Sequence, residues 1–265
     1  MNIWGKVIGG TAGMMLGGPL GAAFGAAMGH AYDRASTVAW QSVWAFMPGG
    51  AAFVQLQEAL QEKFQEQSRQ AVFAVAMLSL GSGLARADGP VNAAEENAFR
   101  RLFGVADDEA EGVMVILRRG LPLGDMEAQA SRVAGLFRDA PGMLEELLAA
   151  LVLLAEADGP LNAAEEDFLN RLAVELGLPP QAWRRAKAGG ARGGSGGGDP
   201  YAVIGVTASA SDAEVRTAYR KLLRETHPDV LMAQGMPAEF IEVANRRMAA
   251  INAAYDDISR LRGLK

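Results

Sequence analysis

Two groups of residues in the sequence have types and a spacing that are suited to chemistry. The first is the tripeptide His227-Pro228-Asp229, which follows a stretch rich in arginine and lysine. The second is a pair of acidic segments, ADGPVNAAEE from residue 87 and ADGPLNAAEE from residue 157. Because carboxylate oxygens bind hard cations and also cap helices, the second group indicates either a Ca²⁺ or Mg²⁺ site or a structural turn.

The acidic segments have the pattern of helix starts. Asn92 and Asn162 are suited to be N-caps, and Glu95 and Glu165 stand where a capping box has its glutamate. Capping leaves the recurring aspartate and the second glutamate of each copy unexplained. A divalent cation is the alternative, although the ligand spacing is not that of an EF-hand. The candidate cation ligands are Asp88, Glu95, Glu96, Asp158, Glu165 and Glu166.

The Asp-Gly pair in each acidic segment predicts the shape of the turn. Glycine adopts a left-handed backbone conformation without steric cost. We therefore expect a left-handed bend at Gly89 and at Gly159, just before the two helix starts.

The composition excludes several kinds of site. The chain of 265 residues has no cysteine, which rules out thiolate catalysis, cysteine-ligated zinc and iron–sulfur clusters. Its formal net charge of −6 argues against a nucleic-acid partner. No serine–histidine–aspartate or paired-carboxylate arrangement is recognisable, and the glycine-rich runs do not follow a strand as a phosphate-binding loop would. We therefore expect a protein that is not an enzyme and requires no cofactor.

The N-terminal residues 1–34 form a glycine-rich segment with the character of a membrane helix. Residues 7–32 contain no Asp, Glu, Lys or Arg, and roughly 20 apolar residues suffice for a helix to cross a bilayer. Glycine recurs at every fourth position, which on a helix makes a groove for close helix–helix packing. We expect a single-pass helix that dimerises through Gly9, Gly13, Gly17, Gly21, Gly25 and Gly29.

The acidic segments belong to a middle region, residues 51–188, that we expect to be entirely helical. An apolar helical stretch precedes each copy and an amphipathic one follows it, and further helices are expected near residues 107–119 and 125–138. The repeated ADGxxNxxEE pattern resembles the TerB-like family of tellurite-resistance proteins. That resemblance implies a helical bundle whose acidic residues are proposed to bind metal.

A glycine-rich linker, residues 189–198, separates the middle region from residues 199–265, which are numerous enough for a small domain of their own. Ser211 and Glu214 predict a capping box at the start of a helix. Apolar residues at helical spacing predict that this helix packs antiparallel to a second one. The His-Pro-Asp turn would then lie at the tip of a helical hairpin.

The segments DPYAVIGV, AYRKL, HPD and INAAYDDI together resemble the J-domain family. The resemblance implies that the tripeptide loop and a basic helix face dock on a DnaK-type chaperone and stimulate its ATP hydrolysis. Proline restrains such a loop, and an exposed aspartate is suited to pair with an arginine of the partner. The residues that the resemblance assigns to this contact are His227, Pro228, Asp229, Arg216, Arg220, Lys221 and Arg224.

Both ends of the chain, WGKVIGG with GHAYDRA and MAQGMPAEFIEVANRRM, resemble the DjlA family of membrane-anchored co-chaperones. This resemblance implies an all-α protein of the bacterial inner membrane, with residues 51–265 in the cytoplasm and a DnaK-type chaperone and the membrane as partners. The alternative hypothesis makes the TerB-like region primary, as a metal-responsive envelope-stress module with an accessory J-domain.

Overall fold

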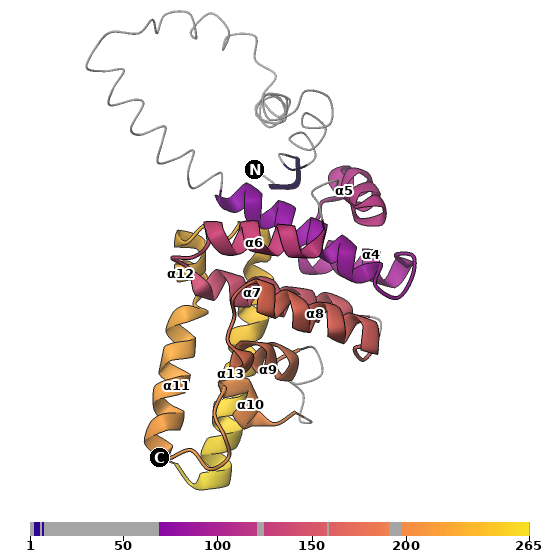
Figure 1. Ribbon diagram of the computed structural model, residues 1–265. Coiled ribbons are helices and arrows are strands. Elements are labelled where there is room, and N and C mark those ends of the chain that lie inside the picture. The colour runs from indigo at the N-terminus through magenta and orange to yellow at the C-terminus, as the bar shows by residue number, and fades with distance from the viewer. Residues whose placement is uncertain are drawn as a thin grey trace, which may run out of the picture.

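The computed structural model describes residues 3–5, 7, 69–120, 125–157, 159–190 and 198–264. Throughout these ranges the regular structure is helical, which confirms the predicted all-α fold. The helices form two groups, a bundle built from residues 69–188 and a long hairpin that projects from it (Figure 1).

The bundle is organised around one central helix. Its elements are the helix through residues 69–85, α4 (Ala93–Leu102), α5 (Asp107–Arg119), α6 (Met126–Leu136), α7 (Pro141–Ala155), α8 (Ala163–Glu175) and α9 (Pro180–Ala188). Every residue of α7 from Glu146 to Ala155 is buried. Because this run is apolar on nearly all sides, neighbouring helices cover it all round. The helices expected near residues 107–119 and 125–138 are confirmed as α5 and α6.

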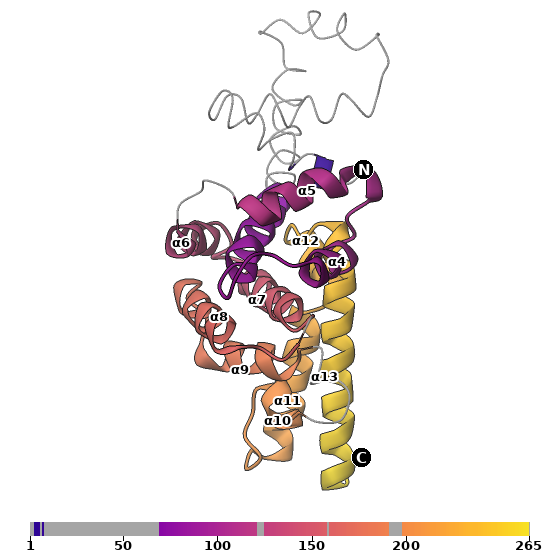
Figure 2. The ribbon, with the colours of Figure 1, turned by 90° about the vertical axis from the view of Figure 1, so that its right-hand side faces the viewer.

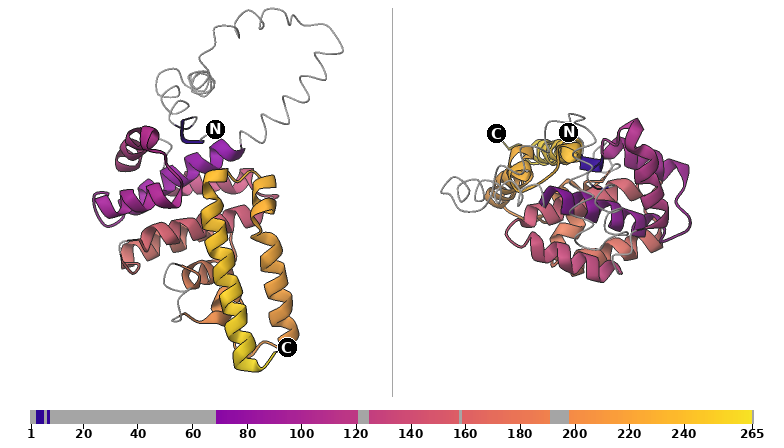
Figure 3. Two further views of the ribbon diagram at one scale, coloured as in Figure 1. Left: turned by 180° about the vertical axis from the view of Figure 1, so that it is seen from behind. Right: turned by 90° about the horizontal axis from the view of Figure 1, so that it is seen from above.

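The hairpin follows the linker. It comprises α10 (Pro200–Ile204), α11 (Asp212–Glu225), α12 (Pro228–Ala233), the short 3-10 helix η2 (Ala238–Phe240) and α13 (Ile241–Arg262). α11 and α13 lie side by side and antiparallel, as Figure 3 shows from behind. The rings of Tyr219 and Tyr255 stack between them at 3.9 Å. The predicted hairpin and the capping box of Ser211 and Glu214 are confirmed.

The two groups share the main hydrophobic core, and the hairpin also has a small core of its own. A small separate core between α10, α11 and α13 contains Val215 and Ile258. By contrast, the α12–η2 end of the hairpin contributes to the main core of the bundle through Leu231, Met236, Phe240, Val243 and Ala244. Figure 2 shows α13 running from the level of α4 past the bundle to the C-terminus. The sequence predicts a unit set apart by a linker, whereas the structure packs one end of that unit into the bundle, because its apolar side chains are covered there.

Residues 3–5 and 7 pack at the junction of the two groups. Trp4 is fully buried, its Nε1 donates to the carbonyl oxygen of Phe103 at 2.8 Å, and its ring lies 5.8 Å from that of Phe240. This contact places Trp4 on the same side of any membrane as the bundle. A single membrane crossing that begins at Val7 would place Trp4 and the bundle on opposite sides of the membrane. One molecule therefore cannot have this crossing and the Trp4 contact at the same time.

Most of the predicted anchor lies outside the described residues, as do residues 51–68 and 191–197. The helices that the structure does describe include none with both the length and the apolar character that a membrane crossing requires. The membrane helix and its dimerisation therefore stay predictions. The glycines concerned are Gly9, Gly13, Gly17, Gly21, Gly25 and Gly29.

The prediction of a left-handed bend in the acidic turns is wrong. Neither Gly89 nor Gly159 has a positive φ, and a Cβ added to either would meet no atom within 4 Å. The first connection spreads its reversal over residues 86–92 and ends in an extended N-cap at Asn92. A turn of that length reverses the chain without a left-handed residue.

Candidate functional site

The His-Pro-Asp tripeptide forms the start of α12. His227 is the N-cap, and its Nδ1 accepts a hydrogen bond from the backbone N–H of Asp229 at 3.2 Å. Pro228 occupies the first helical position, where its missing N–H and fixed φ are favourable. The interpretation that His227 bonds across the bend and holds its shape is therefore confirmed. With Nδ1 used as an acceptor, neutral His227 carries its proton on Nε2.

Buried residues on either side of the loop hold it in place, and the side chains of His227 and Asp229 are exposed to solvent. Thr226 is buried, and its Oγ1 donates to the carbonyl oxygen of Leu222 at 2.8 Å. Leu231, on the first turns of α12, is completely buried in the main core. In contrast, the side chains of His227 and Asp229 are 49% and 87% exposed. The carboxylate of Asp229 is thus available to a donor on another molecule, and its backbone is restrained.

A basic face on α11 leads up to this loop. Arg216, Arg220 and Arg224 recur at intervals of four, so they share one side of the helix. The Nε of Arg220 and that of Arg224 each donate to the carbonyl oxygen four residues earlier, at 3.2 Å. Lys221, beside this row, lies 3.8 Å from the carboxylate of Glu225. This long, exposed pair leaves Lys221 accessible, and the face keeps a positive charge.

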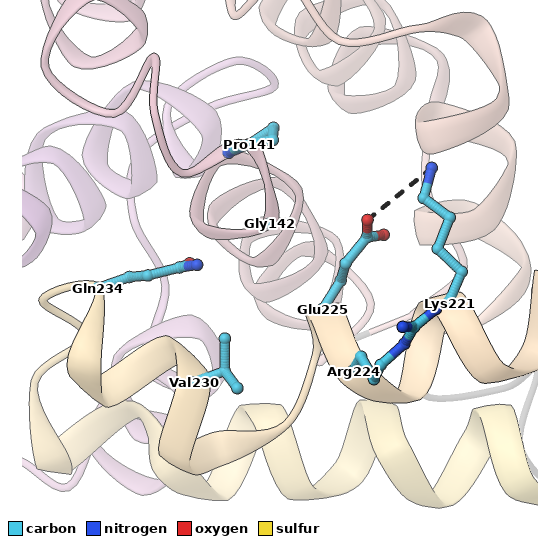
Figure 4. Close-up of a pocket in the computed structure, with 7 residues that line it drawn as sticks. All are labelled: Pro141, Gly142, Lys221, Arg224, Glu225, Val230 and Gln234. Carbon is cyan, nitrogen blue, oxygen red and sulfur yellow. Dashed lines mark ion pairs between the residues drawn. The ribbon is translucent and has the colours of Figure 1, made fainter.

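The bundle stands directly beside the loop and the basic face. A groove between them is lined by Pro141 and Gly142 at the start of α7 and, among others, by Lys221, Arg224 and Glu225 of α11 (Figure 4). The approach is close, since a Cβ on Gly142 would lie 3.1 Å from the carbonyl oxygen of Glu225. The sequence around Gly142 has no local signal for this contact.

A buried cluster of arginines and glutamates joins α13 to the bundle. Arg247 donates to Glu146 at 2.6 Å and to Glu145 at 3.0 Å, and Arg185 donates to Glu145 at 2.6 Å. The side chains of Glu146 and Arg247 are 1% and 7% exposed. Two carboxylates therefore face two guanidinium groups, which balances the charge around the buried pair of Glu146 and Arg247.

Burial affects the two glutamates of this cluster differently. Burial raises the pKa of Glu146, and the adjacent Arg247 offsets this only in part. Burial also acts to raise the pKa of Glu145, but Arg247 and Arg185 together hold that pKa below its ordinary value. Glu146 has one carboxylate oxygen, Oε1, that is buried and accepts no hydrogen bond.

The duplicated acidic turns are helix caps in the structure. Each forms a complete capping box, in which Glu95 accepts from the backbone N–H of Asn92 at 2.6 Å and Glu165 from that of Asn162 at 2.9 Å. The copies also touch, because the Nδ2 of Asn162 donates to Asp88 at 2.7 Å. The capping interpretation is confirmed for both turns.

Glu96 and Glu166 are also engaged in ion pairs. Glu96 pairs with Arg118 at 2.5 Å, a hydrogen bond that lowers the pKa of Glu96, and Glu166 pairs with Lys187 at 2.5 Å. Asp158 lies outside the described residues. Within the described ranges, histidine and acidic side chains do not gather in groups of three or more that could hold a metal ion. The cation stays a prediction that these contacts do not support.

Comparison with known proteins assigns all three parts of the chain. Sequence models of three families match it: the transmembrane domain of co-chaperone DjlA over residues 1–51, tellurite resistance protein TerB over 74–188, and the DnaJ domain over 199–261. The co-chaperone protein DjlA of Shewanella oneidensis is 32% identical over the full length of both chains. The chain belongs to the DjlA family of co-chaperones. The DjlA protein of Photobacterium profundum is 31% identical, over 99% of this chain and 100% of its own. No solved structure matches significantly.

In this member of the DjlA family, the loop and the basic face predicted from the sequence lie together on the J-domain. Sequence reasoning missed the contribution of the TerB domain, which borders the site through Gly142 and holds the J-domain through Arg247. One signal was available for the second contact. Glu146 interrupts the apolar run of α7, and a carboxylate at a buried helical position requires a partner.

Proposed function

We propose that the chain recruits a DnaK-type chaperone through the His227 loop and the basic face of α11, and that it stimulates the chaperone's ATP hydrolysis. The observation that carries this proposal is the restrained loop that exposes the carboxylate of Asp229 beside the exposed bases of α11. An exposed carboxylate in a fixed position is suited to a bidentate pair with an arginine. In this proposal the ATPase is the chaperone, and the chain is its activator rather than an enzyme.

The basic face would act mainly on the encounter. Charges at the rim of an interface steer association and lose this effect as salt is added. Arg220, Lys221 and Arg224 are exposed, so we expect them to accelerate binding to an acidic surface of the chaperone. The loop would then determine how long the complex lasts.

We propose further that residues 1–34 anchor the chain by a single pass in the bacterial inner membrane, with the TerB domain and J-domain in the cytoplasm. The match of residues 1–51 to the DjlA transmembrane domain supports this proposal. In the anchored molecule, the contact of Trp4 with Phe103 would be released, so we assign that contact to the chain before insertion.

Pairing of two anchors through the glycine groove would make the protein a homodimer. Replacement of Gly17 and Gly21 by leucine should then lower the yield of crosslinked dimer in membranes.

The test of the proposed function is a single-turnover ATPase assay of a DnaK-type chaperone with the full chain in detergent. We expect the parent to accelerate hydrolysis and His227→Gln to abolish the acceleration. Asp229→Asn should weaken binding about tenfold or more, because it removes a charge-assisted hydrogen bond. Circular dichroism should be unchanged for both variants, since both side chains are exposed.

A matched control is Asn170→Ala, which changes an exposed polar residue on α8 away from the loop. This variant should stimulate the chaperone as the parent does. Stimulation by His227→Gln equal to that of the parent would show that the loop does not carry the function.

A further inference from the structure

The groove between the two domains continues past the J-domain onto the surface of the bundle. Beyond Gly142 and Lys221, it is lined by Arg138, which follows the C-terminal end of α6. Lys221 and Glu225 line both this part of the groove and the part beside the loop. One continuous surface therefore runs from the J-domain loop to the TerB domain.

Arg138 places an exposed positive charge across the domain boundary from the basic face. Arg138 is exposed, and among the described residues no ion pair holds it. The neighbouring carboxylate of Asp139 is paired with Arg69 at 2.7 Å and does not neutralise it. Three carboxylates line this part of the groove: Glu145, which is paired with Arg185 and Arg247, Glu225, which faces Lys221, and Glu175. In the part of the groove beside the J-domain loop, Lys221 and Arg224 outnumber Glu225, so that part is positive.

The domains are fixed in this arrangement, so Arg138 keeps its place relative to the loop. The ion pairs of Arg247 with Glu145 and Glu146 and the burial of Leu231 in the main core hold the J-domain against the bundle. The close approach of Gly142 to Glu225 leaves little room for sliding. A molecule that docks on the loop therefore meets the same part of the TerB domain every time.

A protein that docks on the J-domain loop also covers the surface around it. Stable protein interfaces bury about 800 Å² on each side, from roughly 20–30 residues. The surface that adjoins the loop and the basic face is that of the TerB domain.

We propose that the TerB domain forms part of the chaperone-binding surface and that Arg138 is its contact with the acidic partner. This inference rests on the proposed function. It assigns the TerB domain a direct part in docking the chaperone. The fixed interface between the domains then orients the chaperone on the chain.

The absence of cysteine from the sequence permits a direct test of proximity. The variant Arg138→Cys in the full chain would carry a single photocrosslinker and be mixed with a DnaK-type chaperone and ATP. We expect a crosslink to the chaperone. The matched control is Arg101→Cys, an exposed arginine of the TerB domain on α4 that does not line the groove. The control should give no crosslink above background.

Charge reversal tests the same contact by function. Arg138→Glu should lower the apparent second-order rate of ATPase stimulation at low salt by about threefold to tenfold, the effect of losing an exposed ion pair and adding a repulsion. The loss should shrink at high salt, and Arg101→Glu should behave as the parent.

Two outcomes would overturn the inference. If Arg138→Cys crosslinks no more than Arg101→Cys, and Arg138→Glu stimulates as the parent does while His227→Gln is inactive, the J-domain alone binds the chaperone. If His227→Gln also stimulates as the parent does, the proposed function itself has failed, and the inference fails with it.

Discussion

Arg247→Met should strongly destabilise the protein because it removes the charge that the buried cluster shares between two domains. Methionine retains much of the length of the side chain, so packing changes little. Glu146, 1% exposed, loses the guanidinium 2.6 Å away, whereas Glu145 keeps Arg185 at 2.6 Å. Breaking a buried ion pair by removing one partner costs about 3–5 kcal/mol. Protonation of Glu146 limits this cost, because the neutral carboxyl needs no partner charge. The raised pKa of Glu146 makes this protonation easier.

The assay is equilibrium unfolding of the full chain in urea and detergent, followed by far-ultraviolet circular dichroism. Arg246→Met is the matched control, since Arg246 is exposed and pairs with Glu242 within one helix turn at 3.0 Å. That pair should contribute no more than about 0.5 kcal/mol. The double variant Arg247→Met with Glu146→Leu should recover most of the loss, because apolar side chains often replace a buried ion pair at little cost.

Two results would refute this reasoning. The first is that Arg247→Met lowers the free energy of unfolding by no more than Arg246→Met does, which would mean that the cluster does not hold the domains together. The second is that the effects of Arg247→Met and Glu146→Leu on the free energy of unfolding add, which would mean that the two side chains do not act as a pair.

Three further predictions concern pH, metal and the N-terminus. Burial raises the pKa of Glu146 above 4.5, so the stability that its protonated form contributes is complete below pH 4.5 and is lost as the pH rises through the folded-state pKa. Glutamine stays neutral, so the free energy of unfolding of Glu146→Gln in urea should increase relative to that of the parent as the pH rises. Parallel pH profiles of the two proteins would contradict this prediction. If a divalent cation binds the acidic turns, millimolar Ca²⁺, Mg²⁺ or Mn²⁺ should raise the melting temperature, and Asp88→Asn with Asp158→Asn should remove the rise; identical melts with metal and with chelator would leave capping alone. Trp4→Ala should cost about 3–5 kcal/mol in the detergent-solubilised chain but little in the membrane-inserted one, and equal losses in urea unfolding would contradict the release of Trp4 on insertion.

Local features of this protein were readable from the sequence because they depend on neighbours within one helix turn. The capping boxes of Asn92, Asn162 and Ser211 each need only two residues at a set spacing. The loop of His227 likewise draws its hydrogen bond from Asp229, two residues away. The left-handed bend at Gly89 was mispredicted because an Asp-Gly pair permits that conformation but does not require it.

The relation between the domains was decided by tertiary structure. Helical periodicity predicts that Phe240, Ala244 and Ile251 share one apolar face, but it does not predict what covers that face. In the structure Ala244 and Ile251 lie on α13, and Phe240 is the residue before it. In the fold, Ile251 packs in the small J-domain core, and Phe240 and Ala244 pack in the core of the TerB domain. Arg247 lies on the same part of α13 and meets Glu146 across 101 positions of sequence. A periodic pattern determines which side of a helix is buried, but the partner depends on the packing of the whole chain, because apolar contact is non-directional.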